Sequence, residues 1–347
     1  MNKKIVVLIL LAIIYFTGSM LIDGGTFKTV KNKFDGEIVT IYQDLHGTED
    51  LDIDREKGLL FISSSDRWSL KAGNRAQDDG IYVLQLDSGN RPIKLSLENY
   101  REEFHPHGIS FFKQNGQSYL YVINHNENGS SVVLFQYMED RLSHLKSIKD
   151  EMMCCPNDLV AVDTDKFYVT NDHGNKDGIM RKMEDYMRIA SSYLLYYDGS
   201  AFIKAYEDLN YANGVALSND GKTLYLTHTT GRELLTFDRN PDTGFLAINT
   251  SLKLGTGVDN ITVDENDIVW VGAHPKLFAF VAHAGNPEKE SPSEVIKITP
   301  YPPDTYGVDR VYQNDGKQLS GSSVALSYKG ELLVGAVFEK KLLRLKP

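Results

Sequence analysis

Short apolar stretches recur along most of the chain, and each follows a turn-forming segment. The stretches are LLFISS (59–64), YLYVINH (119–125), KFYVTND (166–172), TLYLTHT (223–229), IVWVGAH (268–274) and ELLVGAV (331–337). Turn-forming residues followed by a run rich in aliphatic and aromatic residues are typical of β-hairpins. The pattern therefore predicts six copies of a unit built on a hairpin.

Shortly before each of these stretches, a second segment opens with polar residues and runs straight into another apolar strand. These segments are EDLDI (49–53), HGISFF (107–112), NDLVAV (157–162), NGVALS (213–218), DNITVD (259–264) and SSVALS (322–327). A propeller is a ring of four-stranded blades whose innermost strands line a central channel. The sequence predicts an all-β, six-bladed β-propeller with these polar residues, Ser322 in the sixth unit, at one end of the channel.

The two ends of the repeat region are expected to complete one blade together. Residues 37–44 precede the first unit and an apolar run ends the chain, and their pairing would remove exposed sheet edges. The propeller domain is thus predicted to span 37–347. Residues 180–195 instead have apolar side chains at helical spacing. They predict a helix inserted in the third unit, either a lid over the channel or a surface helix.

The N-terminus has the pattern of an export signal. Lys3 and Lys4 precede an apolar run that approaches the length needed to span a bilayer. Residues 1–22 are therefore predicted to be a signal peptide or an uncleaved membrane anchor, and residues 23–36 a linker. Both alternatives place the propeller outside the cytoplasm, either secreted, periplasmic or anchored to the outer side of a membrane.

Composition narrows the functional classes. The formal net charge of −10 argues against a nucleic-acid partner, which requires a basic surface. The only two cysteines, Cys154 and Cys155, are neighbours, so no disulfide framework is expected. Adjacent cysteines bridge only with strain, and the pair is interpreted as buried apolar residues rather than as a redox site.

The predicted ring of polar residues offers carboxylate and amide oxygens, which suit a hard cation and favour calcium over magnesium. Two carboxylates and three amides could hold one ion and leave room for water or substrate. This first set is Glu49, Asn157, Asn213, Asp259 and Asn260. A second ion could lie deeper in the channel. This second set is Asp50 and Asp158 with a backbone carbonyl near Ile109.

Two histidines supply candidate catalytic groups. His107 opens the second unit at the channel, and His125 ends the strand that follows. Either could accept a proton from water near neutral pH. An ion with an open position would polarise a carbonyl or phosphoryl oxygen, so the two features together indicate a hydrolase. A role for His274 beyond its position in the repeat is left open.

At these residues the chain resembles the serum paraoxonase (arylesterase/lactonase) family, from about Glu49 to Phe338. The resemblance rests on stretches such as EDLDI, PHGIS, VINH, NDLVAV, FYVTNDH and WVGAHP. It implies a propeller with two channel calcium ions, a catalytic ion on the first set and a structural ion on the second. It also implies that His107 is the base and His125 its helper. The implied activity is lactone hydrolysis, with aryl esters and some phosphotriesters as further substrates.

The chain also departs from the family pattern. The family disulfide between the first and last strands has no counterpart, because Ile38 and Arg344 stand at those positions. Substrate preference is expected to depend on the loop at 66–79 and the helix at 180–195. The residues that match the pocket walls are Trp68, Tyr211, His274 and Phe338. The rival hypothesis is a non-catalytic extracellular propeller that binds a partner and keeps calcium for stability alone.

Overall fold

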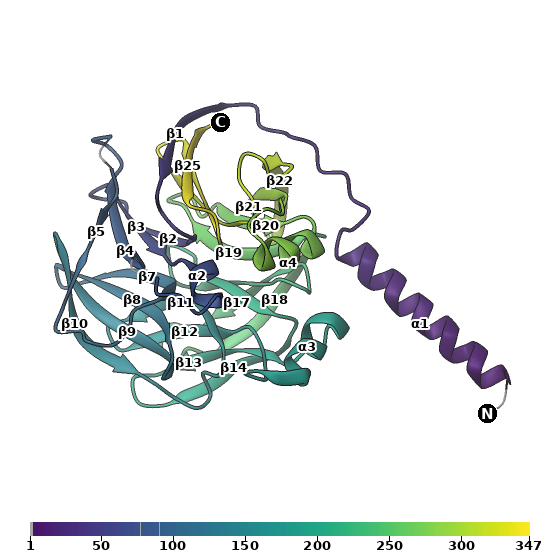
Figure 1. Ribbon diagram of the computed structural model, residues 1–347. Helices are drawn as coiled ribbons and strands as arrows, with labels where there is room; N and C mark the ends of the chain where they lie inside the picture. The colour runs from purple at the N-terminus through teal and green to yellow at the C-terminus, as the bar shows by residue number, and fades with distance from the viewer. Residues whose placement is uncertain (1–2, 77, 90) are drawn as a thin grey trace.

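The computed structural model describes residues 3–76, 78–89 and 91–347. Six sheets surround a common axis (Figure 1), which confirms the predicted six-bladed propeller. The innermost strands of the six blades, in chain order, are β2 (Thr48–Asp54), β7 (Pro106–Gln114), β11 (Pro156–Asp163), β15 (Ala212–Leu217), β19 (Gly257–Val263) and β23 (Ser322–Tyr328). Each of them begins in or next to one of the polar segments found in the sequence.

Most blades then continue outward in chain order. The outer strands of blades 1 and 2 are β3 (Leu59–Ser64), β4 (Gly80–Gln85) and β5 (Ile93–Lys94), then β8 (Gln117–Asn126), β9 (Gly129–Met138) and β10 (Arg141–Ile148), with β6 (Ser96–Glu98) parallel to β10. Those of blades 3 and 4 are β12 (Lys166–Asn171), β13 (Ser192–Tyr197) and β14 (Phe202–Leu209), then β16 (Thr223–His228), β17 (Glu233–Arg239) and β18 (Leu246–Lys253). Those of blade 5 are β20 (Val269–His274), β21 (Ser293–Tyr301) and β22 (Thr305–Asn314).

The last blade joins the two ends of the chain, as the sequence predicted. It has the order β23, β24 (Glu331–Ala336), β25 (Lys341–Lys346) and β1 (Glu37–Gln43). The β1–β25 ladder pairs Thr40 with Arg344 and Ile38 with Leu345, with a bulge between the two pairs. The positions of the missing disulfide thus lie on adjacent paired strands, so backbone pairing and packing close the ring.

Among the described residues, the apolar core consists of six clusters, one between each pair of neighbouring blades. The cluster that closes the ring contains Leu51 and Leu60 from blade 1 together with Val324, Leu333 and Leu342 from blade 6. The other five clusters join the remaining neighbours in the same way. Because both faces of every blade are covered, the strands are apolar on both sides over much of their length.

In every blade the innermost strand leaves its ladder for one or two residues near its start. The irregularities lie between Thr48/Asp50, Pro106/Ile109, Pro156/Leu159, Ala212/Val215, Val258/Ile261 and Ser322/Val324. A bulge bends the strand and frees the extra residue from pairing. All the predicted side-chain ligands except Asp50 lie at these bulges. In blade 6 the bulged residue is Ser323, so the choice of Ser322 for this place was wrong by one residue.

In the described part of the chain, four helices accompany the blades: α1 (Lys3–Asp23), α2 (Arg67–Lys71), α3 (Gly178–Met187) and α4 (Leu277–Gly285). The predicted helix at 180–195 was wrong in its second half, because residues 192–197 form β13 between β12 and β14. Arg188 adopts a left-handed conformation and ends α3. Helix α1 projects away from the propeller (Figure 1), and none of its residues is buried.

We expect Arg344→Ala to lower the free energy of unfolding by about 2 kcal/mol, because it removes hydrogen bonds from a largely buried guanidinium. Arg344 donates to the Leu86 carbonyl at 3.0 Å and to Glu331 at 2.6 Å, and thereby links blades 1 and 6. Urea unfolding of the two proteins measures the difference. Lys346→Ala on the same strand is the control, and an equal loss in both variants would contradict this role for Arg344.

Candidate active site

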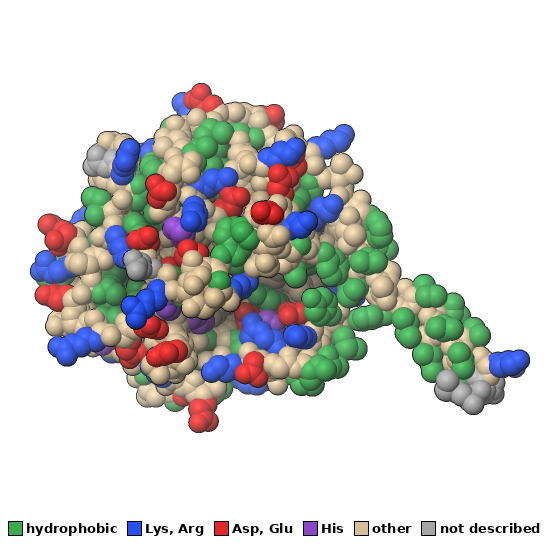
Figure 2. All heavy atoms as spheres, in the orientation of Figure 1, with side chains coloured by type: hydrophobic (Ala, Val, Ile, Leu, Met, Phe, Trp, Pro, Cys, Tyr) green, Lys and Arg blue, Asp and Glu red, His purple; other side chains and the backbone are tan. Residues whose placement is uncertain are grey.

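A cavity of about 540 Å³ opens at one end of the channel. In Figure 2 the face turned to the viewer is hollowed between α3 and α4, close to the point where α1 leaves the propeller. The floor of the cavity is polar and carries residues from several innermost strands. Its walls are largely apolar and include Leu70, Leu277, Phe278, Phe280, Val281 and Phe338. A cavity of this kind is the usual form of a small-molecule site.

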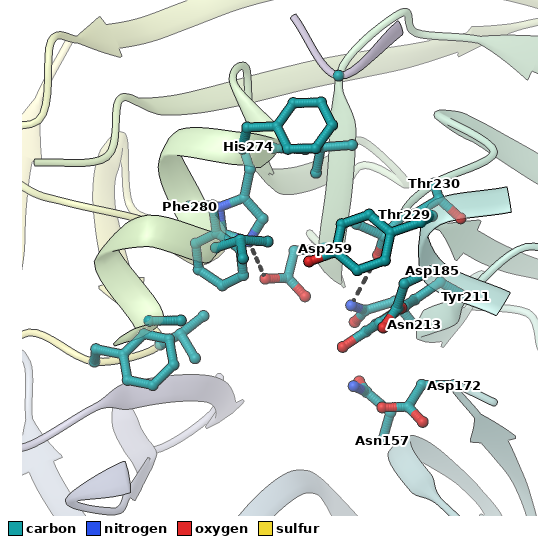
Figure 3. A pocket seen from close by; sticks show the side chains of 18 of the residues that line it. Asn157, Asp172, Asp185, Tyr211, Asn213, Thr229, Thr230, Asp259, His274 and Phe280 are labelled. Carbon is teal, nitrogen blue, oxygen red and sulfur yellow. Dashed lines mark hydrogen bonds and ion pairs between the residues drawn. The ribbon is translucent and has the colours of Figure 1, made fainter. Parts of the chain in front are cut away.

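The first predicted ligand set converges below this cavity. Figure 3 shows Asn157, Asn213 and Asp259 reaching toward one another from three different blades. Glu49 also lines the cavity, and Asn260 lies beneath it and donates to Glu49 at 2.8 Å. All five side chains are almost fully buried. The structure therefore brings together every member of the set.

Four of these five residues have a buried oxygen without a hydrogen-bond partner. The atoms are Oε2 of Glu49 and Oδ1 of Asn157, Asn213 and Asn260. Buried polar atoms are almost always satisfied in folded proteins, because an unpaired one costs about 1–3 kcal/mol. A common partner for all four is the simplest explanation. Carboxylate and amide oxygens are donors that calcium prefers, so the residues fit this ion.

The second ligand set lies further along the channel and is held differently. Asp50 accepts the backbone N–H groups of Leu51 and Ile109, at 2.8 and 2.7 Å. Asp158 accepts those of Leu159 and Val215, at 2.7 and 2.8 Å. Asp50, Asp158 and Ile109 also border a second cavity of about 190 Å³.

Burial and neighbouring charges shift the pKa values of these carboxylates, and the direction of the shift differs from residue to residue. Burial raises the pKa of Asp50 well above its ordinary value, and the charges of Asp158 and Glu49 raise it further. Burial likewise raises the pKa of Asp158, against its backbone hydrogen bonds. Burial alone would also raise the pKa of Glu49, but the charges of His107 and Arg67 help to lower it to about 2. A cation would relieve the repulsion at Asp50 and Asp158.

The two predicted catalytic histidines touch each other. Nδ1 of His107 lies 2.9 Å from Nε2 of His125, whose Nδ1 is 2.8 Å from the Ser130 hydroxyl. Nε2 of His107 lies 3.4 Å from Glu49, and His107 lines the cavity. Burial lowers the pKa of His125 to about 3, and the neighbouring His107 adds to the effect. His125 is therefore neutral over the physiological pH range.

The predicted pocket walls are mostly where the sequence placed them. Tyr211, His274 and Phe338 line the cavity. Nε2 of His274 lies 2.8 Å from Asp259 (Figure 3), so this histidine orients a ligand residue. Trp68 is the exception, because it lies behind the wall, stacked on Phe338 at a centroid distance of 5.5 Å.

Sequence reasoning missed Arg67, a cation that lines the cavity beside the first ligand set. Its Nη1 donates to the carbonyls of Gly47, Ser65 and Val337, and its Nη2 to that of Pro106. One guanidinium thus joins blades 1, 2 and 6 beside Glu49, whose Oε2 is 3.9 Å away. The sequence signal was weak, since a single arginine after a strand is common on surface loops.

The third blade adds a charged cluster that was also missed. Asp172 lines the cavity, lies 2.6 Å from Nδ1 of His173 and pairs with Arg181 at 3.5 Å. Nε2 of His173 lies 2.9 Å from Asp185 on α3. The sequence did offer a signal for this cluster. Asp172 ends the stretch KFYVTND (166–172), just as His125 ends the corresponding stretch YLYVINH (119–125). The contacts of Arg181 and Asp185, one from each half of α3, tie the helix to the channel mouth.

The six blades and the polar-floored cavity at the channel mouth define a propeller with the architecture of an enzyme site. The arylesterase family matches residues 33–344, and the chain belongs to this family. Human serum paraoxonase/arylesterase 1 is 35% identical over 308 residues, which cover 85% of each chain. Human serum paraoxonase/lactonase 3 is 32% identical over 305 residues and 85% of each chain. The protein is a hydrolase of the paraoxonase kind.

Solved structures of lower similarity share the fold. A gluconolactonase from Xanthomonas campestris has a TM-score of 0.52 at 13% identity and covers 92% of this chain and 94% of its own. A calcium-binding protein, regucalcin, from Agrobacterium tumefaciens has a TM-score of 0.53 at 13% identity, with 92% and 95% covered. At these identities the likeness concerns the propeller alone.

The His173 cluster gives a pH prediction. Burial alone would lower the pKa of His173, but its bonds to Asp172 and Asp185 raise it to about 9. A raised pKa stabilises the fold below the unfolded value of about 6.5, and this contribution is lost as the pH rises through 9. We expect His173→Gln to cost about 3 kcal/mol at pH 6 and much less at pH 9.5. Denaturant unfolding at both pH values checks this, and an equal loss at both would contradict it.

Proposed function

We propose that the protein is a calcium-dependent hydrolase that opens lactones and also cleaves aryl esters and some phosphotriesters. The observation that carries this proposal is the group of unpartnered buried oxygens of Glu49, Asn157, Asn213 and Asn260 beneath a cavity that His107 also lines. The names of the relatives, which include a lactonase and arylesterases, support the substrate classes.

A calcium ion on the first ligand set would supply Lewis-acid polarisation of the substrate's carbonyl or phosphoryl oxygen. A second ion on Asp50, Asp158 and the Ile109 carbonyl would be structural, because it would offset the repulsion between buried carboxylates. His274 keeps Asp259 in place through its 2.8 Å contact. The amide Nδ2 of Asn213 is fixed by Thr229 at 3.0 Å (Figure 3), which leaves its oxygen free for a cation.

His107 is the general base in this proposal. Its Nε2 takes a proton from water while Nδ1–H donates to Nε2 of His125, and Nδ1–H of His125 donates to Ser130. The two contacts of 2.9 and 2.8 Å are compatible with this tautomer, and the proposal requires it because a general base needs a free lone pair on Nε2. His125 stays neutral and stabilises the charged imidazole that forms on His107. It is a positioning residue, since it touches His107 and does not line the cavity.

The walls select substrates by shape and exclude water. Trp68 stacks on the side of Phe338 that faces away from the cavity, and His274 stacks on Phe280 at a centroid distance of 3.7 Å. Tyr211 has a φ of 63°, a left-handed conformation that is unusual for a bulky residue, and its ring lies at the cavity. Such an apolar enclosure suits an acyl chain or an aryl leaving group, and it strengthens the electrostatic interactions at the floor.

We expect turnover of phenyl acetate and of aliphatic lactones to disappear when calcium is chelated and to return when calcium is added. His107→Gln should lower kcat by about 10²–10⁴-fold with calcium still bound, because it removes the general base. His144→Gln on the outer strand β10 is the matched control. Activity assays with and without chelator, together with calcium titration calorimetry, measure both effects.

Three outcomes separate the alternatives. Hydrolysis that survives chelation, or an Asp259→Ala protein with unchanged activity, would refute the proposal. Calcium-dependent melting without hydrolysis of any lactone, aryl ester or phosphotriester would favour the non-catalytic binding propeller. Comparison of kcat/KM across the three substrate classes decides which activity is the main one.

The N-terminal helix acts as an export signal that is retained as an anchor. Among the described residues, α1 is the one helix that is long and apolar enough to cross a membrane. The chain just after it packs on the propeller: the Gly24 carbonyl accepts from the Leu277 amide at 2.9 Å. Asp23 bonds Arg232 at 2.7 Å and also contacts Arg188. These contacts hold the chain just after position 22 against the propeller, where a signal peptidase would need an extended and accessible segment, and they therefore favour retention over cleavage.

We therefore expect the mature exported protein to keep residues 1–22 and to sediment with membranes. Mass determination of the N-terminal peptide from the membrane fraction is the measurement. A soluble protein whose first residue lies after position 22 would show that the segment is a cleaved signal.

A further inference from the structure

The two cysteines lie beside the candidate active site rather than in an apolar core. Cys154 and Cys155 precede β11, just before the bulge that carries Asn157. Cys155 is buried, whereas Cys154 is partly exposed. Since the chain has no other cysteine, they form an isolated vicinal pair.

The thiols hold the segment that leads into α3. The Cys154 thiol donates to the His173 carbonyl at 3.1 Å, and the Cys155 thiol to that of Asn175 at 3.6 Å. Arg181 on α3 donates to the Cys155 sulfur at 3.3 Å and lines the cavity. Any change at the two sulfur atoms therefore acts on the third-blade wall of the pocket.

The two sulfur atoms differ in reactivity. The neighbouring Cys155 thiol is the main factor that lowers the pKa of Cys154 to about 7, and the Tyr193 hydroxyl, which donates to the Cys154 sulfur at 3.7 Å, adds to the effect. A fraction of this thiol is therefore ionised near neutral pH. The thiolate is the nucleophile in thiol–disulfide exchange. A partly exposed, acidic thiol beside a buried second thiol is the arrangement of a reactive cysteine with its resolving partner.

We propose that Cys154 and Cys155 form a thiol-modification site that reacts with small-molecule disulfides and closes to a vicinal disulfide. The Cys154 thiolate attacks one sulfur of the small disulfide, forms a mixed disulfide and releases one thiolate. The Cys155 thiol then loses its proton to that thiolate, attacks the Cys154 sulfur and displaces the second thiolate, which takes up a proton from water. One disulfide becomes two thiols, and the chain loses two hydrogen atoms.

The product is strained and therefore reversible. Adjacent Cα atoms lie about 3.8 Å apart, below the separation of about 4.4–6.8 Å usual for disulfides. Strained disulfides have higher reduction potentials and are reduced easily. In the oxidised form Cys154 has no S–H to donate to the His173 carbonyl, and the wall loses this link. The interpretation of the pair as inert apolar residues does not account for these contacts.

The test uses the full-length native protein, reduced and then incubated with glutathione disulfide at neutral pH. We expect intact mass and peptide mapping to show the loss of two hydrogen atoms at 154–155, reversed by dithiothreitol. Cys155→Ser should trap one stable glutathione on Cys154, and Cys154→Ser should take up none. A stable glutathione adduct on the native wild type, or no reaction unless it is denatured, would overturn the proposal.

The effect on the pocket rests on the proposed function and is measured separately. We expect oxidation to raise KM for a bulky aryl ester several-fold with little change in kcat, because the third-blade wall shifts. The Cys154→Ser, Cys155→Ser double variant should not respond to glutathione disulfide. An oxidised wild type with unchanged KM would refute the link to the pocket. A reduced protein without hydrolysis would refute the proposed function and leave the mass result standing.

Discussion

The structure of the channel is constrained by four carboxylates that are buried close together near its axis. They are Glu49, Asp50, Asp158 and Asp259, and each is at most 4% exposed. Like charges in a medium of low dielectric repel strongly and must be neutralised. The chain does this only in part, with backbone N–H groups at Asp50 and Asp158, His274 at Asp259, and His107 and Arg67 near Glu49. The donor set is thus suited to divalent cations, whose binding would be coupled to folding.

The six bulges explain how the fold delivers these groups to the axis. A side chain in a regular ladder faces a neighbouring blade, whereas a bulged residue is freed from pairing. Neighbouring strands also approach closely at these points. A Cβ on Gly108 would lie 2.6 Å from the Cα of Asp158, and one on Gly214 would lie 2.7 Å from the amide of Ile261. Glycine beside the ligand residues therefore permits the narrow channel that the polar ring requires.

The sequence was sufficient for the blades because each repeat combines a turn with an apolar run, and both signals are local. The convergence of the polar residues on the channel could be predicted because a polar start recurs in all six units. The sequence failed where the outcome depends on distant partners. Residues 192–195 have helical spacing, but two flanking strands pair with them. The burial of Arg67 depends on carbonyls contributed by three blades, and no pattern near position 67 reveals them.

The two sides of the cavity are built differently, and this difference bears on how substrate preference can change. Blades 1, 5 and 6 form one side, where Trp68, Phe338 and Phe280 pack together over α2 and α4. Blade 3 forms the other side through α3, which is held by ion pairs of His173 and Arg181 and by the thiol contacts. Apolar packing is insensitive to pH and redox state, whereas each contact of α3 depends on protonation, charge or a free thiol. We therefore expect changes in the shape of the pocket, and in its response to pH and redox state, to arise mainly at the third blade. The floor that would bind the cation would stay the same.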